Sequence, residues 1–149
     1  LLAALAARAA RPSDDAPVRT ATVTSAEGAT ATVTFGDDGV VRVEVRCGAV
    51  LDEIVLRSYA IGAVHMALGW VTSEGLAVDA DGEVRDLTIR SFGVLRAAEM
   101  PPVEVVVHDD DGEPVNGSDA VFAATAAAAW SALGWMPEWP TGRAVGVSE

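Results

Sequence analysis

The chain has 149 residues, half of them hydrophobic, so it is long enough to bury a core and is most simply one domain. Its 22 acidic and 10 basic residues give a formal net charge of −12, and such a surface would repel a phosphate backbone, which argues against nucleic-acid binding. The single Cys47 excludes an internal disulfide and an iron–sulfur cluster built from this chain alone, and it indicates a reducing, cytoplasmic compartment. His65 and His108 have no partner at ligand spacing, so no metal site is predicted.

The first part of the chain predicts the end of a helix and then an antiparallel meander. Residues 1–12 are rich in Ala and Leu and are expected to be the end of a helix or a truncated start, because their arginines do not precede the apolar run as they would in a signal peptide. The segments RTATVTS, ATATVTF and VVRVEVR alternate with period 2, and the breaks AEG and GDDG between them are typical of turns. A single α+β domain is expected to span residues 18–135 and to start with these strands.

The stretch from Leu51 to Gly75 is apolar almost all round and predicts a buried helix of roughly five turns. No segment is expected to reach the length of about 18 apolar residues that a membrane span requires, so no membrane partner is predicted. Ser58, Gly62, His65 and Gly69 fall on one stripe of this helix, made mostly of small residues. We expect a close neighbour along this stripe, either a sheet or second helix, with His65 packed or hydrogen-bonded in the core, or a ligand.

The second half of the chain predicts a hairpin, a strand and a second main helix. The turn DADGE requires Gly82 at a positive φ, and two prolines start the strand in MPPVEVVVHDDDGEP. The segment NGSD then leads into the alanine-rich helix AVFAATAAAAWSALG. This order indicates an α+β fold of antiparallel strands with two main helices packed on them. Residues 136–149 are expected to be an irregular tail that buries its aromatic rings on this chain or on a partner.

The segment from CGAV to VEVVV resembles the C-terminal part of the molybdopterin-binding large subunit of the xanthine dehydrogenase and aldehyde oxidase family, the molybdenum hydroxylases. That family has a Gly-rich helix, G-Q-x-x-G-G-x-x-Q-G-L-G-x-A-L-x-E, followed by a D-x-x-G turn and a P-x-I-E-V strand. The residues that fall on this frame in order are Cys47, Gly48, Gly62, Leu68, Gly69, Ser73, Glu74, Leu76, Asp81, Gly82, Pro102, Glu104 and Val105. The resemblance covers about residues 30 to 134 and implies the fold of the C-terminal half of that molybdopterin-binding domain.

The resemblance also implies a catalytic position at the start of the alanine-rich helix. In the family, a G-V-G-E-P loop leads into this helix, and its glutamate is the general base for the hydroxyl attack on the substrate carbon. Asp119 falls on that glutamate, one methylene shorter, with Gly117 and Ser118 on the glycine positions. The literal GEP at residues 112–114 offers Glu113 as an alternative, at the cost of a gap before the helix.

Cofactor contacts are implied on both helices. Ser58 and Tyr59 stand where the family has the Gly-Gln pair whose glutamine hydrogen-bonds the pterin, and Gly62 follows on the same helix. Gly117 and Ser118 are the implied cofactor-binding residues before the second helix. These five residues would hold a molybdopterin-type molybdenum cofactor.

The implied function is a segment or subunit of a molybdenum hydroxylase, which oxidatively hydroxylates an aldehyde or an N-heterocycle with water as the oxygen source. The pocket would be completed by the remaining part of the molybdopterin subunit, and FAD and iron–sulfur subunits are further implied partners. The isolated chain is expected to bind no cofactor and to show no oxidase activity. The alternatives are a non-catalytic structural or assembly relative that kept the fold, and an unrelated α+β binding module.

Overall fold

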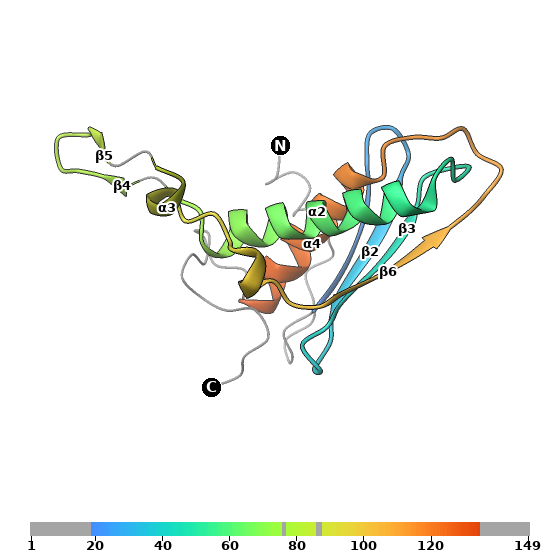
Figure 1. Cartoon of the computed structure of the whole chain (residues 1–149), viewed down its shortest axis with the longest axis horizontal. Coiled ribbons are helices and arrows are strands. Elements are labelled where there is room, and N and C mark those ends of the chain that lie inside the picture. Colours follow the sequence, from blue (N-terminus) through green and yellow to red (C-terminus); the bar gives the residue numbers. More distant parts are fainter. Residues whose placement is uncertain (1–18, 76, 86–87, 135–149) are drawn as a thin grey trace.

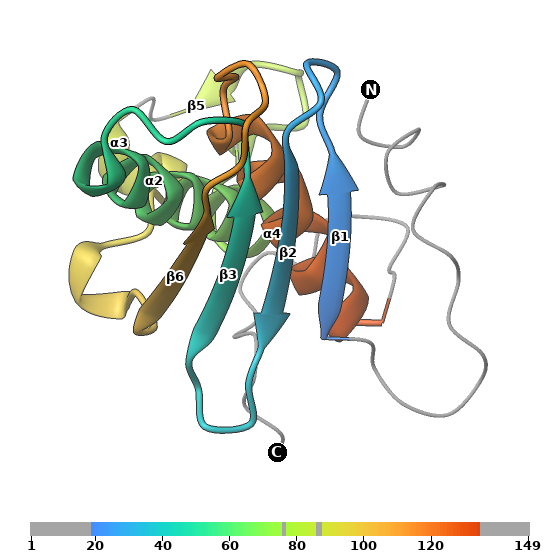
Figure 2. The same cartoon turned by 90° about the vertical axis from the view of Figure 1, so that its right-hand side faces the viewer.

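The computed structural model describes residues 19–75, 77–85 and 88–134, so the predictions for residues 1–12 and 136–149 lie outside the described residues. Four strands form a sheet in the order β1-β2-β3-β6, with both main helices on one face (Figure 2). The predicted meander is confirmed: β1 (Thr20–Thr24), β2 (Thr30–Phe35) and β3 (Val41–Arg46) pair antiparallel. The fourth strand, β6 (Val103–His108), comes from the second half of the chain.

The sheet is mixed, because β6 runs parallel to β3, with Val41 opposite Val103 and Arg46 opposite His108. Antiparallel strands alone were predicted from the sequence. The difference arises because the segment between β3 and β6 includes a long helix, which carries the chain back to the end of the sheet where β3 began. As a consequence, the C-terminal ends of β3 and β6 lie at the same end of the sheet, and the loops that follow these strands are neighbours.

Alternation along the strands separates a buried face from a polar face. The inner side chains are apolar, with Ala31, Val33, Val43 and Val45 fully or almost fully buried beneath the helices. The outer face of β1 and β2 carries threonine pairs whose hydroxyls hydrogen-bond across the strands, at 3.0 Å for the pair Thr20–Thr34, 2.8 Å for Thr22–Thr32 and 3.1 Å for Thr24–Thr30. The outer face of β1 and β2 is thus polar.

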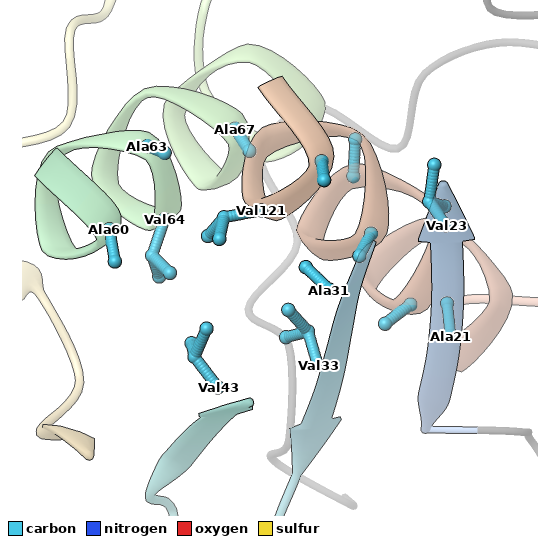
Figure 3. Packing of buried hydrophobic residues seen from close by; sticks show 14 of the residues in the cluster. Ala21, Val23, Ala31, Val33, Val43, Ala60, Ala63, Val64, Ala67 and Val121 are labelled. Atoms are coloured by element: carbon cyan, nitrogen blue, oxygen red, sulfur yellow. The ribbon is translucent and has the colours of Figure 1, made fainter. Parts of the chain in front are cut away.

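The two predicted main helices are α2 (Glu53–Thr72) and α4 (Ser118–Ala132). Helix α4 lies over β1 and β2, and α2 packs beside α4 and reaches β6 (Figure 2). Ala60, Ala63 and Ala67 of α2 point into the core beside Val121 of α4 (Figure 3). The small alanine side chains allow the two helix backbones to approach closely, and the observed architecture is the predicted α+β class.

Helix α2 begins at the Asp52 cap, whose Oδ1 accepts a hydrogen bond of 3.0 Å from the backbone N–H of Val55. The expectation that no segment is long and apolar enough to cross a membrane is wrong, because α2 meets both conditions by length and composition. One face of α2 is buried against α4 and the sheet, and 39% of its apolar window lies inside the structure, as part of the core of the described fold. Helices of that kind commonly pass the same test, so α2 is weak support for a membrane span.

The small-residue stripe of α2 is closely packed only at its C-terminal end. Gly69 is buried against Glu74 and Leu95, and His65 Nε2 lies 2.7 Å from the backbone oxygen of Leu95, so the predicted hydrogen-bonded histidine is confirmed. The predicted close neighbour at Gly62 is wrong: a Cβ built there would meet no atom within 4 Å. Ser58 is exposed as well. The core instead takes the adjacent face of α2, which carries the alanines.

The remaining elements follow α2 in the chain and lead back to the sheet. The predicted hairpin is formed by β4 (Ala77–Val78) and β5 (Val84–Arg85), and the φ of +83° at Gly82 confirms the turn. Helix α3 (Ile89–Phe92) and the 3₁₀ helix η1 (Ala97–Glu99) then lead to β6. The hairpin extends away from the main sheet (Figure 1).

Candidate functional site

A pocket of about 280 Å³ lies where the β3–α2 connection, the first turns of α2 and the loop before α4 meet. Three residues predicted to bind the cofactor, Tyr59, Gly117 and Ser118, lie in its wall. The complete lining is Cys47, Ala49, Val50, Leu51, Asp52, Val55, Leu56, Tyr59, Pro114, Val115, Asn116, Gly117 and Ser118. Most of these side chains are apolar, and polar groups enter at the starts of the two helices.

The pocket forms because hydrogen bonds join the loop after β3 to the loop after β6. The backbone N–H of Val115 donates to the Cys47 carbonyl at 3.0 Å, and that of Ala49 donates to the Gly112 carbonyl at 2.9 Å. The Val50 N–H completes this link by donating to a carboxylate oxygen of Asp109. The parallel pairing of β3 with β6 therefore places the two loops on the same side of the pocket.

Two glycines allow these loops to approach. Gly48 has a φ of +80°, and a Cβ at this position would overlap the backbone carbonyl of Glu113. Gly117 is buried, and a Cβ there would lie 3.1 Å from Val45 Cγ2 and 3.3 Å from Cys47 Sγ. Larger side chains at either position would push the loop before α4 away from β3.

The start of α4 is organised by Asn116. Its Oδ1 accepts from the Ser118 backbone N–H at 3.0 Å and from the Ser118 hydroxyl at 2.6 Å. Its Nδ2 donates to Asp119 Oδ1 at 3.2 Å. The N-cap residue is Gly117, which has no side chain to cap the helix. Asp119 lies in the first turn, where a carboxylate is favoured by the helix dipole, and its side chain is exposed.

The other predicted site residues lie outside the pocket lining. Ser58 and Gly62 are on the outer face of α2, Glu113 is exposed in the loop after β6, and Asp119 is beside Asn116 at the helix start. The structure therefore brings together Tyr59, Gly117 and Ser118, and it places both predicted general bases next to lining residues but outside the lining itself.

Sequence reasoning missed three polar members of the pocket: Cys47, Asn116 and Asp52, the last of which caps α2. Asn116 could have been found, since an Asn two residues before a helix-starting Ser is a usual source of side-chain turns. Cys47 gives no comparable signal, and its burial, together with the nearby charge of Asp110, raises the pKa of its thiol. In the described ranges 19–75, 77–85 and 88–134, no group of three or more His, Cys, Asp or Glu side chains is placed to hold a metal ion.

The fold is that of a segment found within larger oxidoreductases. The sequence matches no protein-family model and no curated protein. Solved structures do match it, and the chain aligns over 67 to 71% of its own length while covering only 14 to 15% of theirs. Because the identities are 12 to 13%, this likeness concerns the fold alone.

The particular structures are a CO dehydrogenase and a quinoline oxidoreductase. Cu,Mo-CO dehydrogenase in its carbon monoxide-reduced state aligns with a TM-score of 0.53 at 12% identity. Reconstituted CO dehydrogenase from Oligotropha carboxidovorans aligns with 0.51 at 12%, and quinoline 2-oxidoreductase from Pseudomonas putida 86 with 0.53 at 13%. The resemblance to molybdenum hydroxylases predicted from the sequence is thereby confirmed at the level of the fold.

Proposed function

We propose that this chain is a segment or subunit of a molybdenum hydroxylase and forms one wall of a molybdopterin pocket that a second polypeptide completes. The observation that carries this proposal is the shared fold with Cu,Mo-CO dehydrogenase and quinoline 2-oxidoreductase, together with the pocket that contains Tyr59, Gly117 and Ser118. The proposed reaction is oxidative hydroxylation of an aldehyde or N-heterocycle in the cytoplasm. FAD and iron–sulfur subunits are proposed further partners.

The residues present fit a part of such a cofactor. The first turn of α4 offers backbone N–H groups and the positive end of the helix dipole, which suit an anionic group. Tyr59 and Ser118 add hydroxyls to the lining. None of the lining residues is Lys or Arg, and the carboxylate of Asp52 is among them, so charge compensation for a phosphate would have to come from the second polypeptide. The bound cofactor would supply the redox chemistry.

Asp119 is the proposed general base, with Glu113 as the alternative. A general base must lie within hydrogen-bond reach of the proton it takes. The Asp119 carboxylate is held 3.2 Å from the amide of Asn116, which itself lines the pocket. The proposed base therefore lies one residue beyond the pocket lining, next to Ser118 and Asn116.

The position of Asp119 also favours a second candidate, a non-catalytic relative that kept the fold. The carboxylate lies outside the pocket lining and is already engaged by Asn116. A protein of this kind would assemble with the second polypeptide and leave the chemistry to other residues.

The decisive experiment measures molybdenum and pterin in the chain purified together with the polypeptide that carries the rest of the larger fold. We expect both in stoichiometric amounts in the complex and neither in the isolated chain. Asp119→Ala should keep the cofactor and lower turnover by about 100-fold or more, while Glu113→Ala should have little effect. A complex without molybdenum and pterin would contradict the proposal, and a loaded complex indifferent to both substitutions would favour the non-catalytic relative.

A further inference from the structure

The outer face of α2 is apolar and lacks a partner within the described part of the chain. Ile54 is 82% exposed and Met66 is 56% exposed, and Leu51, Val55, Tyr59 and Ile61 are exposed around them. The stretch from Ser58 to Thr72 contains no Asp, Glu, Lys or Arg, although the whole chain carries a net charge of −12. A contiguous apolar surface of this kind on a highly charged protein usually marks an interaction site.

Large and small residues both contribute to this face. With 100° per residue, Ile54 and Ile61 fall on one side of the helix face, and Tyr59 and Met66 fall on the other. Val55 and Gly62 fall between them, and a Cβ at Gly62 would meet no atom within 4 Å. An apolar side chain of another polypeptide could therefore approach the α2 backbone at Gly62.

An acidic rim borders the N-terminal end of this face. The loop after β6 carries Asp109, Asp110, Asp111 and Glu113, and it is bonded to the connection that immediately precedes α2. All four side chains are exposed, and in the part of the chain that the structure describes no ion pair joins them to a basic residue. Opposing Lys or Arg side chains would complement this rim.

We propose that the outer face of α2 is the docking surface for the second polypeptide that carries the rest of the larger fold. The proposal rests on the proposed function, and it adds the surface and the chemistry of the partner: an apolar surface against the exposed side chains of α2 and basic residues against the acidic rim. The partner's size follows from the solved structures, because this chain covers only 14 to 15% of their length. A second copy of this chain is disfavoured, since it would place acidic rims and charges of −12 against each other.

The test measures association of the full chain with the polypeptide, encoded in the same gene or beside it, that carries the remainder of the molybdopterin-binding fold. Both are produced without molybdenum cofactor, and binding is followed by calorimetry in 0.1 M salt. Ile61→Glu and Met66→Glu should each weaken binding by about 100-fold. The double substitution Asp110→Lys and Asp111→Lys should also weaken binding. Its effect on the affinity should be larger at low salt than at high salt, because salt screens the interaction between charges.

The matched control is Val106→Glu, which changes an equally apolar residue, 49% exposed, on the outer face of the sheet. It should leave binding within about threefold of the unmodified chain. Melting curves of each variant show that the fold is intact, because every substituted side chain is exposed.

Three results would overturn the proposal. The first is that Ile61→Glu and Met66→Glu bind the second polypeptide as tightly as the unmodified chain does. The second is that the second polypeptide does not bind at all, and the third is a homodimer in 0.1 M salt that Ile61→Glu dissociates. The proposed function fails in a different way: the complex forms through this face, but when both chains are produced in cells that make the cofactor, the purified complex contains neither molybdenum nor pterin.

Discussion

At the scale of single residues, glycines in this chain serve different purposes that the sequence alone does not separate. Gly48 takes a positive φ and leaves room for the Glu113 carbonyl, and Gly117 leaves room for Cys47. Gly62 lies in the middle of α2 with open space around it. Only the first two are required by the fold of the isolated chain.

Replacing Gly62 with Ala should therefore stabilise the isolated chain by about 0.5 to 1 kcal/mol, because Ala loses less conformational freedom in a helix and meets no neighbour here. The free energy of unfolding in urea measures this change. Gly48→Ala is the matched control and should destabilise the chain, since its φ of +80° and the Glu113 carbonyl both oppose a side chain. A loss of stability in Gly62→Ala would indicate a neighbour at this position.

The Asp38–Arg42 ion pair predicts an acid-sensitive contribution at the β2–β3 turn. Arg42 Nη2 lies 2.5 Å from Asp38 Oδ2, and this hydrogen bond, with a second from the Val40 N–H, lowers the pKa of Asp38 from 3.8 to about 2. Because the folded pKa is below the unfolded one, the pair stabilises the fold above about pH 4, and this contribution is lost as the pH falls through about 2.

Arg42→Gln should raise the pKa of Asp38 toward its ordinary value in a carboxyl NMR titration. Asp38→Asn should be less stable than the unmodified chain at pH 5, because it lacks the ion pair. The free energies of unfolding of the two chains should converge near pH 2. If the pKa of Asp38 is the same in Arg42→Gln as in the unmodified chain, the ion pair does not persist in solution.

At the scale of elements, the hydrophobic pattern predicted which segments form helices and strands, and it did not predict which face each helix buries. Helix α2 is apolar nearly all round, so periodicity could not distinguish the buried Ala60 and Ala63 from the exposed Ile54 and Met66. The parallel position of β6 was also not predictable, because register between distant strands has no local signal. In the candidate site, the family resemblance found Tyr59, Gly117 and Ser118 but not the role of Asn116.

The alanine-rich contact between α2 and α4 predicts sensitivity to larger side chains. Ala67 of α2 is fully buried and points into the core beside Val121 of α4 (Figure 3), so Ala67→Leu should cost about 1 to 3 kcal/mol through overpacking, measured by urea unfolding. Ala98→Leu, at an exposed position of η1, is the control and should change stability by less than about 0.5 kcal/mol. Equal effects of the two substitutions would mean that the helices do not pack as closely as described.

At the scale of the whole molecule, the two sides of the fold differ in chemistry. The outer face of the sheet carries hydrogen-bonded threonines and the ion pair between Arg42 and Glu104 at 3.3 Å. The opposite side exposes the apolar face of α2 beside an acidic loop. Self-association of the isolated chain is thus favoured by apolar contact and opposed by charge.

This balance predicts an unusual response to salt. At 0.1 M salt the Debye length is about 10 Å, and repulsion between two chains of net charge −12 should keep the isolated chain monomeric. At 1 M salt the length falls to about 3 Å, so the α2 faces can meet and weak association should appear in sedimentation experiments. Ile61→Glu should stay monomeric at both concentrations, since it places a charge on the apolar face. Association that is strongest at low salt would show instead that opposite charges, rather than the apolar face of α2, bring the copies together.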